Sequence, residues 1–167
     1  MTTVQKAAEN LRNMGNGITD AEVDERGFVK AQFPNPLGTP YELFVHPIPE
    51  RLTLRIRVPE VAKVHRDSEV IRLLGKLNFD ILYGCVGIDL DGEVMVEVNH
   101  PCQDGEVEDP SPEVFARLVE AVLETVRVAS KMILHAQMVE GGASDAVARQ
   151  LITKLFDDGS EADKETL

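Results

Sequence analysis

Residues 111–133 read SPEVFARLVEAVLETVRVASKMI, and this stretch decides the fold. Its opening, Ser111-Pro112-Glu113, supplies an N-cap, a first-turn proline and an acid that complements the helix dipole. Apolar residues continue at helical spacing to Val139, and Gly141-Gly142 then stops the pattern. We therefore predict a long helix over about 112–139, which would measure about 42 Å.

This predicted helix is apolar over more than half of its circumference, whereas a surface helix normally buries one stripe of a little over 100°. One apolar face suits packing on a sheet. The second must be covered by the last helix, by a second copy of the chain or by a partner. In water it would expose a larger patch than monomers usually tolerate. We expect a homodimer whose interface includes Val128, Met132 and Val139.

The segment just before this helix reads VIRLLGKLNFDILYGCVGIDLDGEVMVEVNHP over residues 70–101. It begins with a helix pattern at 68–77, in which Asn78 could close the C-terminus. Strand candidates at 79–90 and 93–99 then flank Asp91-Gly92, a pair that suits a type I′ hairpin turn. The order predicted here is helix, hairpin, long helix.

The remaining elements complete an α+β chain. A short amphipathic helix at 3–13 precedes four strand candidates, and a final helix spans about 144–156. We predict an antiparallel sheet flanked by helices, in the order α-β-β-β-β-α-β-β-α-α, within one domain over 1–156. Residues 157–167 hold five acids and one lysine and should form a disordered acidic tail. The four expected early strands cover 18–24, 28–33, 41–46 and 52–58.

Composition limits the function. The chain of 167 residues has a formal charge of −12, which argues against direct nucleic-acid binding and against adsorption to anionic lipid. It contains no apolar run of about 18 residues, so we expect no membrane span. Two cysteines do not make a disulfide framework, and we expect a cytoplasmic protein.

Candidate chemistry is sparse. The four histidines form no HxxxH or HExxH pattern, and phosphate-binding and nucleophile-elbow motifs are absent from the sequence. Two alternating clusters could be imagined as a cation site or a thiol site, but a hairpin turn and an acidic loop suit neither role. We expect no catalytic, cofactor-binding or metal-binding residues and no enzyme activity, with a small enzyme as an alternative. The clusters are Asp89, Asp91 and Glu93, and His100, Cys102 and Asp104.

Positive charge collects between residues 51 and 66, where five bases accompany one acid, Glu60. The simplest interpretation is the solvated face of a strand, because Leu52, Leu54 and Ile56 alternate with polar residues. The functional interpretation is a docking strip for an acidic partner segment. An accessory role beside nucleic-acid-processing proteins is an alternative for the same strip. The five bases are Arg51, Arg55, Arg57, Lys63 and Arg66.

The segments 70–101 and 111–133 resemble the YbjN-like family of bacterial sensory transduction regulators, which shares its fold with the type III secretion chaperones. The resemblance covers about residues 3–139 and rests on the pattern of helix, Asp-Gly hairpin and long helix. It implies a homodimeric protein-binding module without catalytic residues. Two features depart from the family: four strands precede the second helix where about three are expected, and an extra helix follows the long one.

These observations together predict a non-catalytic module, chaperone-like or adaptor and regulatory, that binds a segment of a partner protein. Strand addition at a sheet edge and helix docking in an apolar groove are the two modes that such a fold offers.

Overall fold

The computed structural model describes residues 2–15, 17–48, 51–58, 69–80, 84–88, 91–101 and 109–161. Its element order is the predicted one and confirms the α+β class. The elements are α1 (Thr3–Met14), β1 (Thr19–Val23), β2 (Val29–Phe33), β3 (Tyr41–Ile48), β4 (Arg51–Arg57), α2 (Glu69–Asp80), β5 (Cys85–Ile88), β6 (Val94–Pro101), α3 (Pro112–Glu140) and α4 (Asp145–Glu161).

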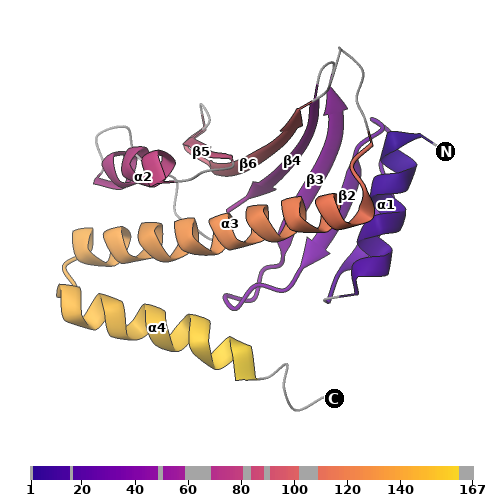
Figure 1. Ribbon diagram of the computed structural model, residues 1–167. Coiled ribbons are helices and arrows are strands. Elements are labelled where there is room, and N and C mark those ends of the chain that lie inside the picture. The colour runs from indigo at the N-terminus through magenta and orange to yellow at the C-terminus, as the bar shows by residue number, and fades with distance from the viewer. Residues whose placement is uncertain are drawn as a thin grey trace.

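The strands form one six-stranded antiparallel sheet in the order β1-β2-β3-β4-β6-β5. Period-two alternation gives it one apolar face, to which β4 contributes Leu52, Leu54 and Ile56, all fully buried. In Figure 1, α1 and the first half of α3 lie against the sheet. The main core is therefore the layer between this sheet face and these two helices.

Helix α3 has 29 residues and begins as the sequence predicts, with the Val114 backbone N–H donating to Ser111 Oγ at 3.3 Å. Phe115 and Val119 in its first half are buried against the sheet side. An ion pair between Lys6 and Asp109 ties α1 to the segment where α3 starts. The second half of α3 runs beyond the sheet, with α2 on one side and α4 on the other (Figure 1).

The boundary between α2 and β5 differs from the prediction. Phe79 belongs to α2, and β5 starts only at Cys85. Asn78, expected to close the helix, lies within it. Its carboxamide hydrogen-bonds the backbone of β5. Gly84 has φ +122°, and a Cβ there would lie 2.6 Å from the Glu97 carbonyl oxygen, so a larger residue would break the approach of β5 to β6.

The Asp91-Gly92 turn also differs. Only Gly92 has a positive φ, of 81°, whereas a type I′ turn requires positive φ at both central residues. Helix α4 continues to Glu161, five residues beyond its expected end at Phe156. The rest of the expected tail, 162–167, lies outside the described residues. No helix in the described part of the chain combines the length and apolarity needed to cross a bilayer.

Candidate functional site

The described part of the basic strip predicted from the sequence lies on β4. Acidic side chains of the neighbouring hairpin form ion pairs with two of its arginines. Arg55 Nε donates to Glu97 Oε2 at 3.1 Å, and Arg57 Nη1 lies 3.3 Å from Glu93 Oε1. Arg51 is exposed at the start of β4. The other two strip residues, Lys63 and Arg66, lie outside the described residues.

Glu97 is the centre of a polar network on this sheet face. Asn99 donates from Nδ2 to Glu97 Oε1 at 3.0 Å and accepts from the buried Thr53 hydroxyl at 2.8 Å. Burial alone would raise the pKa of Glu97, but hydrogen bonds from Arg55 and Asn99 and the charge of Arg55 hold that pKa below its usual range. In the described part of the strip, the positive charges of Arg55 and Arg57 are therefore paired with carboxylates of the same sheet.

Nucleophilic chemistry is disfavoured at the one described cysteine. Cys85 is exposed, yet partial burial of its sulfur and the nearby Glu97 carboxylate raise the pKa of the thiol. A nucleophilic cysteine needs the opposite shift. The described residues contain no group of three or more His, Cys, Asp or Glu side chains placed to hold a metal ion. Asp89, Cys102 and Asp104, which the sequence placed in two candidate clusters, lie outside the described residues.

Helix side chains already occupy backbone groups at both edges of the sheet. At the β5 edge, Asn78 donates to the Val86 carbonyl and accepts from the Val86 N–H, each at 2.6 Å. At the β1 edge, Arg12 donates twice to the Ala21 carbonyl, at 3.0 and 2.7 Å. An added strand needs these same groups. Strand addition is therefore disfavoured where these two side chains bind.

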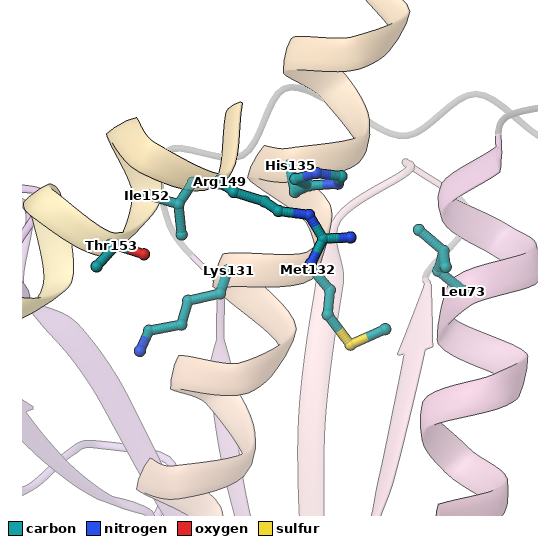
Figure 2. Close-up of a pocket in the computed structure, with 7 residues that line it drawn as sticks. All are labelled: Leu73, Lys131, Met132, His135, Arg149, Ile152 and Thr153. Carbon is teal, nitrogen blue, oxygen red and sulfur yellow. The ribbon is translucent and has the colours of Figure 1, made fainter. Parts of the chain in front are cut away.

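The helical end of the molecule carries a surface groove of about 390 Å³ between α2, α3 and α4. Figure 2 shows α3 at its centre, with Met132 and His135 between Leu73 of α2 on one side and Ile152 of α4 on the other. Its lining is largely apolar: Met132 of α3 forms the floor, and Leu73 and Ile152 line the two walls. A cavity of this size accepts side chains of a partner rather than a whole helix.

Cationic side chains border the groove. The Lys131 ammonium lies 5.1 Å from the centroid of the Phe156 ring. Arg149 extends from α4 toward Met132 (Figure 2), while its Nε donates to Asp145 Oδ2 at 2.7 Å. That bond holds the pKa of Asp145 below its usual range. His135 Nε2 is buried 3.0 Å from Asp145 Oδ1 but is not aligned for a hydrogen bond.

The row predicted as a dimer interface follows the floor of this groove. Met132 lines the groove, Val128 lies one turn before it, and Val139 lies two turns after it. Val128 is 39% exposed and Val139 is 41% exposed. Helix α4 packs beside this row, along the side of α3 that carries Lys131 and His135. The row therefore remains open to solvent in one chain.

Sequence reasoning missed the groove walls. Leu73, Ile152 and Thr153 read as ordinary residues of short amphipathic helices, and His135 as a residue with a structural or solvated role. The local pairing of Asp145 with Arg149, four residues apart, was visible as a helix-surface pattern. That α2 and α4 converge on one turn of α3 was not visible, since it depends on tertiary packing.

A second apolar surface lies on α4 itself. Ala148, Ile152 and Phe156 are buried, while Val147, Leu151 and Leu155 form an exposed ridge at four-residue spacing. At 100° per residue, this ridge lies on the side of α4 opposite to Arg149 and Thr153, which face the groove. The ridge is convex and the groove is concave.

Three solved structures are similar to this chain. A structure of YbjN from E. coli, described there as a proposed transcription regulator, has 15% identity over 76% of this chain and 88% of its own, with a TM-score of 0.52. A chain of the ExsC–ExsE complex has 17% identity over 80% and 97%, with a TM-score of 0.55. A chain of the ExoU–SpcU heterodimer from the type III secretion system of Pseudomonas aeruginosa has 15% identity over 75% and 96%, with a TM-score of 0.48.

No family model matches this sequence, and a search of curated proteins finds no significant match. The likeness to solved structures is therefore a likeness of fold. It confirms the resemblance to the YbjN-like and type III secretion chaperone-like architecture that the sequence predicted.

Proposed function

We propose that this chain is a non-catalytic protein-binding module, chaperone-like or adaptor, that holds an apolar segment of another protein in the groove between α2, α3 and α4. The observation that carries the proposal is the open apolar lining of the groove. Leu73, Met132 and Ile152 line it, and Val128 and Val139 are exposed on α3 on either side of Met132. A contiguous apolar surface that a fold leaves in water is typical of an interaction site.

Two further observations support this function. The ExsC–ExsE structure, which has a similar fold, is a complex of two proteins. Within the described residues, most side chains with shifted pKa values belong to ion pairs and hydrogen-bond networks on the surface, such as Glu97 with Arg55 and Asp145 with Arg149. Cys85 and His46, whose pKa values are shifted mainly by burial, are the exceptions.

Homodimerisation through Val128, Met132 and Val139 is the second candidate use of this row. The exposure of both valines favours it as well. A second copy and a partner segment would compete for one surface. Light scattering separates them, because a homodimer has twice the 18.4 kDa mass of one chain.

The test of the proposal is selection of binders. A display library of helical peptides is selected for binding to the immobilised full chain. The enriched peptides are then tested for binding to the Met132→Asp variant. The unpaired carboxylate would lie on the groove floor, where it cannot keep its full hydration when a segment docks. We expect enriched peptides with apolar residues at helical spacing that lose binding to the variant by about a hundredfold.

Val147→Asp is the matched control, because it adds the same charge to the exposed ridge on the other side of α4. Circular dichroism checks that both variants fold. If the library yields no binders, or if the binders keep their affinity for Met132→Asp, the groove is not the binding surface.

A further inference from the structure

We infer that the segment held in this groove is an amphipathic α-helix whose polar flank is acidic. This inference rests on the proposed function and adds the conformation and the charge of the partner. It follows from the backbone groups that the site offers, the length of its floor, its shape and the charges at its rim.

A helix is the conformation that fits. The walls and floor of the groove are helices α2, α3 and α4, whose interior backbone groups are already paired within each helix. An extended peptide would bring unpaired backbone N–H and C=O groups to a surface whose own backbone groups cannot form hydrogen bonds with them. A helix arrives with its backbone satisfied and presents only side chains.

The floor also has the length of a short helix. From Val128 to Val139 the chain advances 11 residues along α3, which is about 16 Å. A partner helix of about three turns covers that distance. Its apolar side chains, repeated every three or four residues, would meet Val128, the Met132 groove and Val139 in succession.

The cationic side chains at the rim of the groove favour a negatively charged partner segment. Lys131 has no carboxylate partner among the described side chains, and its ammonium rests over the Phe156 ring. Arg149 bonds Asp145 through Nε, so its two terminal amino groups remain available to a bound carboxylate. Two of the acids near the groove are engaged: Asp145 with Arg149, and Glu140 with the Glu69 backbone N–H at 3.0 Å.

The net charge of −12 does not outweigh these contacts. Repulsion between an acidic partner and distant acids is screened beyond about 8 Å at physiological ionic strength. Pairs at the rim act at contact distance. Each such exposed pair contributes at most about fivefold in affinity.

The shape of the surface argues against a second copy as the occupant. Two concave grooves related by a twofold axis do not fill each other. The convex ridge of Val147, Leu151 and Leu155 could enter the groove of another chain, but it lies on the opposite side of α4 from the groove. Such a contact would be head-to-tail and would leave a free groove and a free ridge at the two ends.

Two synthetic peptides test the inference by fluorescence anisotropy with the full chain. Both carry leucines at positions i, i+3, i+4 and i+7, and their flanking positions hold glutamate in one and lysine in the other. We expect the glutamate peptide to bind about tenfold more tightly than the lysine peptide. The charge reversal Lys131→Glu should cancel or invert this preference. Lys154→Glu, on the part of α4 turned away from the groove, should not.

The outcomes separate the two levels of the proposal. Equal binding of both peptides, abolished by Met132→Asp, would overturn the acidic partner and leave the groove proposal standing. Binding of neither peptide, or binding that survives Met132→Asp, would overturn both. A wild-type mass of twice 18.4 kDa that falls to 18.4 kDa in the Met132→Asp variant would make a second copy the occupant and overturn the inference.

Discussion

The two ends of this molecule treat apolar surface in opposite ways. At the sheet end, α1 and the first half of α3 close over the sheet, and Phe115, Leu52 and Leu54 are at most 1% exposed. At the helical end, α2 and α4 flank the second half of α3 without closing over it, and valines and leucines there remain 39–48% exposed. The same α3 serves both ends, so its two halves have different tasks.

This difference teaches that stability and binding are separated along one helix. The first half buries Phe115, Val119 and Val122 in the core, and Val114 in its first turn is the exposed exception. The second half keeps part of its apolar row accessible. Substitutions should therefore affect folding strongly at one end and weakly at the other.

The largest expected effect is at the sheet end. Phe115→Ala would leave a cavity between α1, α3 and the sheet and should cost about 3–5 kcal/mol of unfolding free energy. The matched change at the other end, Val139→Ala, should stay within about 0.5 kcal/mol because that side chain is 41% exposed. Urea unfolding of the two variants measures the contrast. Similar losses for both would show that α3 is not divided in this way.

A smaller effect is expected where the two ends meet, at the contact of α2 with β5. Asn78→Ala removes both side-chain partners of the Val86 backbone and should cost about 1–3 kcal/mol. Hydrogen exchange of the Val86 amide should speed up with it. Lys76→Ala, on the same helix, is the control for a general weakening of α2. An unchanged Val86 exchange rate would show that Asn78 is not the group protecting this edge.

The smallest effect concerns pH and the open face of the sheet. Since the folded-state pKa of Glu97 lies below its ordinary value, ionised Glu97 stabilises the fold above that ordinary value. This stability is lost as the pH falls through the lowered pKa. Because Arg55 is partly solvated, with 42% of its side chain exposed, we expect only about 1 kcal/mol or less.

Comparison with Glu97→Gln isolates this contribution. Unfolding free energies of the two proteins, followed from neutral pH to about pH 3, should converge as Glu97 takes up its proton. A constant difference over the whole range would show that the ionised carboxylate adds no stability through its partners Arg55 and Asn99.

Most of the fold could be predicted because its signals are local. The Ser111 cap, the alternation along β4 and the glycines after α3 are each read within a few residues. The start of β5 could not be predicted, because Asn78 ends no helix and instead bonds a strand eight residues later.

The candidate site was half predictable. The breadth of the apolar row on α3 pointed to Val128, Met132 and Val139, since helical periodicity alone places them on one face. The walls of the groove could not be found from periodicity. Leu73 and Arg149 are 76 residues apart in number, and only the packing of α2 and α4 brings them to the same turn of α3.

The turn at Gly141-Gly142 has a consequence for how long a bound segment would stay in the groove. Helix α4 packs mainly on α3 and does so through a single stripe, Ala148, Ile152 and Phe156. The free energy of a local opening follows the apolar area that the opening exposes, so α4 should detach far more often than α3 leaves the sheet. The α4 wall of the groove should therefore open more often than the α3 floor that it borders. Release would then be governed by the opening rate of α4, and substitutions in its buried stripe would shorten residence time more than they slow association.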